Sequence, residues 1–180
     1  MNRVQSVDDI TNPYIKRILT NVIGKDPMKV LNQTPKRLRK LIKGLKKKQL
    51  RHQPAPDKWS IRQIVVHLSD AEIALSWRMR LALAQSGAPI TAYDQDAWAK
   101  NLQYEQADID EKVQVFTVLR RMHAAMLSRL SEEEWGRFGL HSERGKETVE
   151  QMATHLAGHD INHLNQIKAI RASFKKKKKK

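Results

Sequence analysis

The chain has 180 residues, 40% of them hydrophobic, which is enough for one domain with a buried core. It contains no cysteine, so disulfide bridges, thiolate metal ligands and a cysteine nucleophile are excluded, and any metal ligand must be His, Asp or Glu. No segment approaches the roughly 18 apolar residues of a membrane span, and we expect a soluble, cytoplasmic protein that does not act at a membrane.

The net charge of +15 is concentrated in two segments. Residues 36–51 carry lysines and arginines without an intervening acid, and residues 175–180 are all lysine. These two segments account for the whole net charge, so the rest of the chain is formally neutral. The final lysines have no apolar neighbour to pack against, and we interpret residues 175–180 as an appended, disordered tail after a single domain of residues 1–174.

Capping signals predict where each helix begins. Such a signal is Ser, Thr, Asp or Asn, followed by Glu or Gln three residues later or directly by Pro. Two short helical pieces are expected after Asn12-Pro13 and Asp26-Pro27. Longer helices are then predicted from Thr34-Pro35 to about Lys48, from Ser60 to about Gln85, from Asp108 to near Leu130, and from Thr148 onward, with a short turn of helix after Ser131 that holds Trp135.

The apolar residues of the long helices recur at intervals of three and four, as expected for helices that pack on a core. In the helix after Ser60 they are Ile61, Ile64, Val65, Leu68, Ala71, Leu75, Met79 and Ala82. In the helix after Asp108 they are Ile109, Val113, Phe116, Leu119, Met122 or His123, Met126 and Leu130. We find no alternating strand pattern, phosphate-binding glycine loop or internal repeat. The predicted fold is all-α, a four-helix bundle with short extra N-terminal helices.

The segment of residues 87–107 is long for a connection within a bundle. It contains aromatic and acidic residues, namely Tyr93, Asp94, Asp96, Trp98 and Tyr104. It either caps one end of the bundle or is a long crossover that packs two aromatic side chains against the core.

The last helix carries histidines within its apolar stripe. That stripe consists of Val149, Met152, Leu156, Ile167 and Ile170. His159 and His163 fall in it with i, i+4 spacing, by which one helix supplies two nitrogen ligands to one metal ion. His155 lies at the edge of the stripe beside Gln166, and both residues are candidates for a hydrogen-bonding role next to the ligands or for a place on the substrate side.

A third ligand must come from another helix, and His67 is the candidate at the border of the apolar face after Ser60. Taken alone, such a histidine is more often hydrogen-bonded in a core than bound to a metal. Two buried imidazoles without partners would each cost on the order of 1–3 kcal/mol, so the three histidines together favour a metal site. His52, His123 and His141 show no such spacing and are interpreted as ordinary histidines.

Several motifs resemble the DinB/YfiT-like superfamily in order along residues 12–171. They are Trp59-Ser60-Ile61-Arg62-Gln63-Ile64, His67-Leu68-Ser69-Asp70-Ala71-Glu72, Tyr93-Asp94-Gln95-Asp96-Ala97-Trp98, His141-Ser142-Glu143-Arg144-Gly145 and His159-Asp160-Ile161-Asn162-His163-Leu164-Asn165-Gln166-Ile167. The resemblance implies a DinB-like four-helix bundle, often a homodimer, with a divalent metal held by His67, His159 and His163. The basic segment of residues 36–51 and the lysine tail depart from the family pattern.

Three imidazoles without a carboxylate leave coordination positions open, as in catalytic metal sites. Nickel, zinc, iron and manganese all accept imidazole, and the sequence does not select among them. The resemblance implies either a metal-dependent hydrolase or an enzyme that transfers a low-molecular-weight thiol. We favour the thiol S-transferase, acting on a small molecule, because no general base is evident. Substrate-side candidates are Tyr93, Asp94, His141 and Glu143.

A nucleic-acid-binding helical protein is the alternative from another functional class, based on the basic segment of residues 36–51. Its apolar residues Leu38, Leu41, Ile42 and Leu45 form a stripe, with the bases on the other faces, as in a solvated amphipathic helix. No aromatic residue is interleaved to stack on bases, which disfavours nucleic acid. A third possibility is a bundle whose metal serves only as a scaffold or a sensor.

Overall fold

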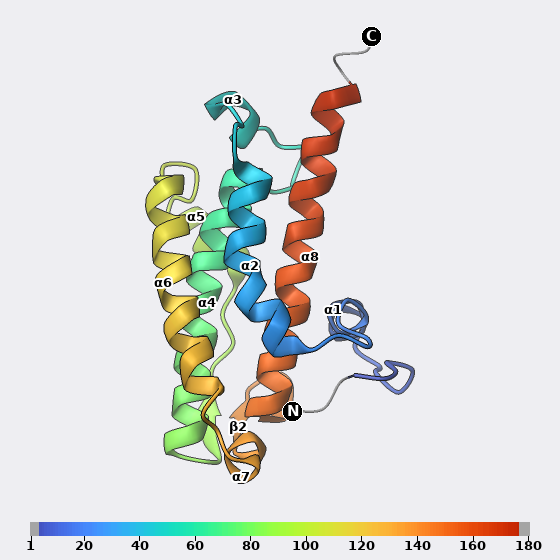
Figure 1. The fold of residues 1–180 in the computed structure, drawn as a ribbon, viewed down its shortest axis with the longest axis vertical. Helices are drawn as coiled ribbons and strands as arrows, with labels where there is room; N and C mark the ends of the chain where they lie inside the picture. The colour runs from blue at the N-terminus through green and yellow to red at the C-terminus, as the bar shows by residue number, and fades with distance from the viewer. Residues whose placement is uncertain (1–3, 177–180) are drawn as a thin grey trace.

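Four long helices form a bundle in the computed structural model, which describes residues 4–176 (Figure 1). They are α2 (Pro27–Ile42), α4 (Ile61–Ala84), α6 (Ile109–Leu127) and α8 (Val149–Lys176). Shorter helices lie in the connections, namely α1 (Pro13–Thr20), α3 (Lys47–Leu50), α5 (Gln95–Asn101) and α7 (Glu132–Gly136). The predicted four-helix bundle is confirmed. No helix in this part of the chain has the length and hydropathy needed to cross a membrane.

The predicted caps define the starts of the helices. The Ser60 hydroxyl accepts a hydrogen bond from the Gln63 backbone N–H, and the Gln63 side chain accepts one from the Ser60 backbone N–H. Thr148 and Gln151 make the same reciprocal pair at the start of α8. Asp108 caps α6. These interactions are local in the chain, which is why the sequence predicts them well.

The predicted bounds of the first long helix were wrong at both ends. The helix α2 begins at Pro27, because the Asp26 side chain accepts a hydrogen bond from the Lys29 N–H and caps it there. Pro35 therefore lies inside the helix. Proline has no N–H, so the carbonyl of Leu31 is left without its helical donor, and Arg120 Nη1 of α6 donates to it instead at 3.3 Å. The helix ends at Ile42, before Gly44 with its positive φ of 76°.

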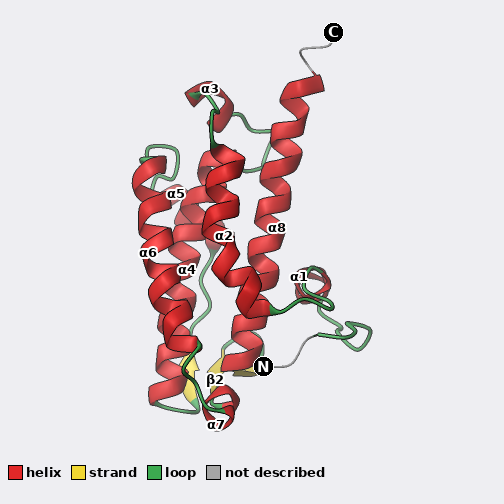
Figure 2. Cartoon of the chain, in the orientation of Figure 1, coloured by secondary structure: helices red, strands yellow, loops and turns green. Residues whose placement is uncertain are grey.

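A small three-stranded sheet lies at one end of the bundle, although no strand was predicted (Figure 2). Strand β1 (Ala88–Ile90) pairs in parallel with β2 (Phe138–His141), and β2 pairs antiparallel with β3 (Gly145–Thr148). Strands of three or four residues are too short to show a clear alternating pattern. The sheet places His141 opposite Ile90 and directly before the turn that carries Glu143 and Arg144.

The segment of residues 87–107 is a crossover. It leaves the sheet end of the bundle after α4 and runs to the other end, where α6 begins (Figure 1). Helices α4 and α6 consequently run in the same direction, as the figure shows. Tyr104 is buried at 1% exposure, and the rings of Tyr93 and Trp98 pack with their centroids 4.3 Å apart. The crossover alternative is therefore the one that the structure adopts.

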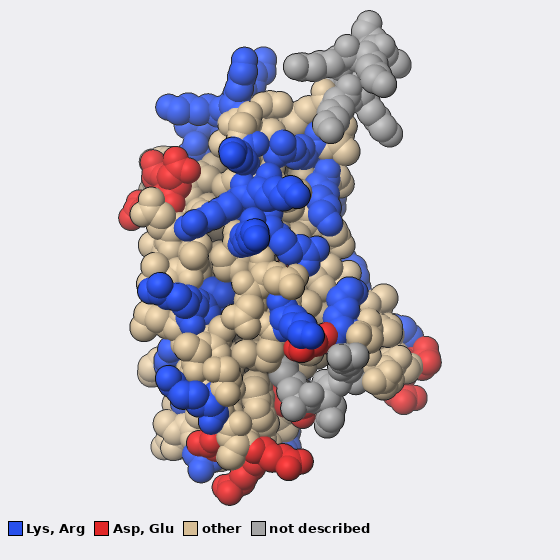
Figure 3. All heavy atoms as spheres, viewed as in Figure 1, with Lys and Arg blue, Asp and Glu red and all other residues tan. Residues whose placement is uncertain are grey.

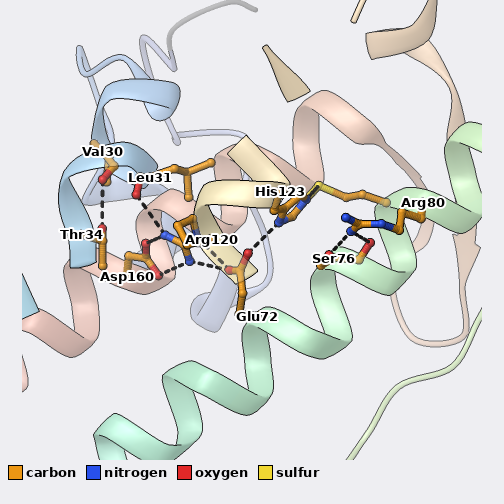
Figure 4. Close-up of polar contacts among 10 residues, drawn as sticks. Val30, Leu31, Thr34, Glu72, Ser76, Arg80, Arg120, His123 and Asp160 are labelled. Carbon is orange, nitrogen blue, oxygen red and sulfur yellow. Dashed lines mark hydrogen bonds and ion pairs between the residues drawn. The ribbon is translucent and has the colours of Figure 1, made fainter. Parts of the chain in front are cut away.

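The bundle core consists of two apolar clusters separated by a polar layer. One cluster contains Leu75, Met79 and Met152 and the other contains Ile64, Phe116 and Leu164, among further residues. Between them lie buried charged and polar side chains from all four long helices (Figure 4): Thr34, Glu72, Arg120, His123 and Asp160.

Arg120 occupies the centre of this polar layer and is 1% exposed. It makes ion pairs with Glu72 at 2.7 Å and with Asp160. His123 Nδ1 lies 2.8 Å from Glu72 Oε1. On α6 the core face thus includes His123, with 0% exposure, and not Met122, with 55% exposure. The periodicity left Met122 and His123 as alternatives for this core position, and His123 occupies it, where Glu72 accepts its hydrogen bond.

Lysine and arginine side chains cover much of one face over α2 and α3 (Figure 3). The apolar side of this basic segment packs inward: Leu38 is fully buried, and Leu41, Ile42 and Leu45 contact the cluster around Ile64. The segment is therefore amphipathic, as predicted. The predicted tail of residues 175–180 overlaps the end of α8, which continues to Lys176, and residues 177–180 lie outside the described part of the chain.

Candidate metal centre

Two neighbouring helices bring three buried histidines together. His67 comes from α4, and His159 and His163 come from successive turns of α8. Their exposed fractions are only 1%, 5% and 6%. The apolar residues on the same faces, such as Leu68 and Leu164, pack in the core and hold the two helices together. The histidines therefore meet because they lie within the stripes that form the bundle.

The imidazole Nε2 atoms converge. Nε2 of His159 lies 2.9 Å from Nε2 of His67 and 3.1 Å from Nε2 of His163. Each of the three rings offers one nitrogen within 4.8 Å of the others. The cluster contains no carboxylate and no residue outside the predicted set among the described residues.

Gln166 defines the tautomer of one ring. His163 Nδ1 lies 2.9 Å from Gln166 Oε1, so this nitrogen donates its proton and Nε2 presents a lone pair to the cluster. Gln166 is thus the predicted hydrogen-bonding neighbour that the structure shows in contact with the cluster. For Nδ1 of His67 and of His159, both buried, no hydrogen-bond partner is found within the described chain.

Burial keeps the three imidazoles neutral. It lowers the pKa of His163 to about 4 and outweighs the hydrogen bond to Gln166, which raises this pKa. Burial, reinforced by the neighbouring histidines, also holds the pKa values of His67 and His159 well below their ordinary value. Neutral imidazole is the form that binds metals, so the cluster is ready to act as a ligand set at neutral pH.

The donor set fits a divalent transition metal. Two nitrogen ligands at right angles, each about 2.1 Å from one ion, lie about 3.0 Å apart, which matches the observed Nε2 separations. Nε2 of His159 lies close to the Nε2 atoms of both His67 and His163. Without an ion, its single N–H can donate a hydrogen bond to only one of them. An ion would instead use all three lone pairs, and three ligands leave coordination positions open.

We expect the metal-free protein to lose stability as the pH falls from about 6.5 towards 4. Unfolded histidine binds a proton near pH 6.5, whereas folded His155 and His163 do so only near 4 because burial lowers their pKa values. The unfolded state therefore binds more protons in this window, and each group reduces the free energy of unfolding by about 1.4 kcal/mol per pH unit. Urea unfolding after chelator treatment, measured between pH 7.5 and 5, tests this.

His155→Leu is the matched variant for that experiment. It removes one imidazole of lowered pKa outside the cluster, so its stability should depend less steeply on pH than that of the unaltered protein. A free energy of unfolding that stays constant between pH 7 and 5 in both proteins would contradict the expectation.

Two cavities flank the histidines. One has a volume of about 190 Å³ and is lined by His67 and His159, and the other has a volume of about 490 Å³ and is lined by His163. Tyr14 and Gln95 line both cavities, so the two are neighbours, and each is lined by at least one histidine of the cluster. Both cavities therefore offer space for a small molecule beside the cluster.

Trp59 packs against two of the histidines. Its ring centroid lies 4.7 Å from that of His67 and 6.2 Å from that of His163, nearly parallel to the latter. The tryptophan precedes the cap of α4 and also lines the larger cavity. Sequence reasoning did not single it out as a functional residue, and only its place in the first family motif indicated it.

Only some of the other predicted site residues lie near the histidine cluster. Tyr93, His141, Glu143 and His155 line the smaller cavity with His67 and His159. Asp94 caps α5, accepting hydrogen bonds from the N–H groups of Asp96 and Ala97. His52 packs against Phe174, with ring centroids 5.4 Å apart, and His123 belongs to the polar layer.

Two arginines of the smaller cavity, Arg78 and Arg144, were not predicted as site residues. Arg78 lies three residues after Leu75 and one before Met79, both in the apolar stripe of α4. A charged residue beside an apolar stripe is rarely buried without a reason, so the sequence pattern could have indicated Arg78 as a functional residue. Arg144 follows the second strand in a turn, and no periodic pattern marks it.

Comparison with known proteins places these features in a family. The sequence profile of the DinB superfamily matches residues 31–167. A protein of Oceanobacillus iheyensis, named a putative metal-dependent hydrolase, is 25% identical over 142 residues, which cover 78% of this chain and 81% of that protein. A Bacillus licheniformis protein of the same name is 28% identical over 142 residues, covering 78% and 81%.

A solved structure shows the same fold. The structure of YfiT from Bacillus subtilis, described as a probable metal-dependent hydrolase with an unusual four-helix bundle topology, superimposes with a TM-score of 0.78. The match covers 97% of this chain and 95% of that chain at 20% sequence identity.

Proposed function

Since this chain belongs to the DinB superfamily, we propose that it is a metal-dependent enzyme in which His67, His159 and His163 hold one divalent ion. The observation that carries the proposal is the convergence of the Nε2 atoms of three neutral imidazoles that line two neighbouring cavities. A closed structural site would need a fourth protein ligand, and the described cluster has none.

The reaction we propose is transfer of a small thiol to a soft electrophile. A divalent ion in this site supplies Lewis acidity, which lowers the pKa of a thiol or water that it binds. In the transfer, the thiol loses its proton to solvent, its sulfur bonds to a carbon of the electrophile, and the leaving group departs with the electron pair. The two cavities provide separate places for the two reactants.

The residues around the smaller cavity favour a thiol over water as the nucleophile. Hydrolysis profits from a positioned acid or base near the nucleophile. Burial lowers the pKa of His155 to about 4, which makes it a weak base at neutral pH. Glu147 is paired with Arg144 at 2.8 Å, and Glu143 is exposed to solvent. A thiol needs no such base, because its pKa of about 8.5 falls readily on coordination.

Metal-dependent hydrolysis is the second candidate. It is favoured by the names of the relatives from Oceanobacillus iheyensis and Bacillus licheniformis. His141 and Glu143 line the cavity beside His67 and His159 and are the groups that would assist such a reaction.

An assay with two substrates separates the candidates. We expect the metal-loaded protein to accelerate consumption of a chloro-dinitrobenzene by a small thiol by at least about tenfold more than it accelerates hydrolysis of a nitrophenyl ester. A chelator should abolish the activity, and so should His163→Ala. Fast ester hydrolysis without dependence on thiol would replace transfer by hydrolysis, and turnover that survives the chelator would refute a metal-dependent reaction.

A further inference from the structure

The smaller cavity has a cationic wall that the proposed metal chemistry does not use. Besides His67 and His159, the wall includes Arg78, Tyr93, His141 and Arg144. Arg78 and Arg144 are the arginines that line this cavity of about 190 Å³, and Glu143 lines it with them, so the charge that remains depends on how each arginine is paired.

Arg78 is a buried cation without an anionic partner. The residue is 8% exposed, and its Nη2 donates one hydrogen bond to the Thr91 carbonyl at 2.6 Å. Its guanidinium lies over the ring of Tyr93, 5.3 Å from the centroid. No ion pair is found for Arg78 in the described part of the chain, although guanidinium has five N–H donors. Buried charges are normally paired, so this one is available to a ligand.

The carboxylates nearby do not occupy Arg78. Glu147 is held by Arg144, whose Nε and Nη2 lie 3.3 and 2.8 Å from its two oxygens. Glu143 lines the same cavity, but its side chain is exposed and makes no ion pair with Arg78 within the described residues. Glu147 and Glu143 attract the charge of Arg78, but neither carboxylate forms an ion pair with its guanidinium among the described residues, so its remaining N–H groups are open to a ligand.

His141 supplies a second donor in the same wall. Its Nδ1 accepts a hydrogen bond from the Glu143 backbone N–H at 3.2 Å, so the proton of the neutral ring is on Nε2. This Nε2 is buried and has no hydrogen-bond partner among the described residues. The residue is 3% exposed, and the strand pairing of β2 with β1 and β3 holds it in place.

We propose that Arg78, assisted by His141, binds a carboxylate of the small-molecule substrate next to the histidine cluster. The proposal rests on the proposed function in one respect, namely that the reactive group of the same molecule lies at His67 and His159. A planar carboxylate matches the flat guanidinium fork, and the size of the cavity suits a small organic acid. The thiol reactant would thus carry a carboxylate as well as its thiol, as a mercaptocarboxylic acid does.

Binding of two matched thiols to the unaltered, metal-loaded protein tests the proposal without turnover. Mercaptopropionate and mercaptopropanamide have the same thiol and nearly the same size, but only the first is an anion. Calorimetry should show mercaptopropionate binding at least about tenfold more tightly. Equal affinity for the two thiols would overturn the proposal.

Variants assign the preference to Arg78. In Arg78→Met the preference for mercaptopropionate should disappear, while the affinity for mercaptopropanamide and the metal content stay the same. Arg80→Met is the matched control on α4: this arginine bonds to Ser76 and does not line the cavity, so the preference should persist. If Arg78→Met folds poorly, the comparison is made with Arg78→Gln, and an intact preference in either folded variant overturns the assignment.

Competition distinguishes a carboxylate from a phosphate. Propionate should displace mercaptopropionate from the unaltered protein more effectively than inorganic phosphate does, and stronger displacement by phosphate would overturn the carboxylate assignment.

Failure of the proposed function would give a different result from failure of the carboxylate site. If the protein prefers mercaptopropionate through Arg78 but transfers no thiol, the carboxylate site is supported and the transferase function is refuted. If the protein transfers both thiols equally well, the transferase function is supported and the carboxylate site is refuted.

Discussion

Replacing His159 with alanine is expected to remove nearly all bound metal from the purified protein. Its Nε2 lies between those of His67 and His163, at 2.9 and 3.1 Å, so the variant loses the central ligand of the cluster. Loss of an outer hydrogen bond alone typically weakens metal binding by about 10–100-fold, and loss of a ligand should exceed that. Elemental analysis of protein purified without a histidine tag measures the effect.

The helical circular dichroism of His159→Ala should stay close to that of the unaltered protein, because the apolar clusters on either side form the bundle. His155→Ala is the matched control, since it removes a buried imidazole one turn earlier on the same helix but outside the cluster. Full metal content in His159→Ala, or an equal loss in His155→Ala, would refute the ligand assignment.

Replacing Arg120 with methionine should destabilise the protein by about 3–5 kcal/mol, which is among the largest effects of a single substitution. The variant leaves Glu72 and Asp160 as buried carboxylates without their counter-charge (Figure 4). It also leaves the Leu31 carbonyl, freed by Pro35, without its donor. Thermal unfolding should show a fall in Tm of roughly 10 °C or more.

The neighbouring Arg121 provides the control for this experiment, because it is exposed on the same helix and Arg121→Met should change Tm little. A second test adds Glu72→Gln and Asp160→Asn to Arg120→Met. Removing all three charges should restore part of the lost stability, since no uncompensated charge remains. A loss below about 1 kcal/mol in Arg120→Met would show that the polar layer contributes little to folding.

The acid behaviour of Glu72 follows from the same contacts. Burial raises its pKa, but the charge of Arg120 and hydrogen bonds from His123 and Arg120 outweigh burial and lower the pKa to about 2. The folded state therefore holds this carboxylate ionised at every pH where the unfolded state does. Its contribution to stability is complete above about pH 4.5 and is lost only as the pH falls towards 2.

Much of the bundle could be predicted because its signals are local. Helix starts at Ser60, Asp108 and Thr148 depend on hydrogen bonds between residues three positions apart. The shared face of His159 and His163 depends only on the helical repeat. His67, on another helix, was the candidate third ligand from its place at the border of an apolar face, and the family motifs implied the same residue.

Other features were wrong or missed because their causes lie far away in the chain. The start of α2 at Pro27 is tolerated with Pro35 inside the helix because Arg120 of α6 reaches the freed carbonyl of Leu31. Strand β1 pairs with β2 across about fifty residues of sequence, so no local signal marks it, and the hairpin of β2 and β3 is too short to show an alternating pattern. His123 turns inward because Glu72 of α4 accepts its hydrogen bond.

The sequence by itself determined the helix caps, the apolar stripes and the placement of two histidines on one face, since these depend on interactions within one or two helical turns. Only the tertiary structure decided that Nε2 of His67 lies 2.9 Å from that of His159, that two cavities flank the cluster, and that Arg78 is buried without an ion-pair partner in the described chain. Such contacts join residues distant in sequence, and the packing of the whole core sets their distances.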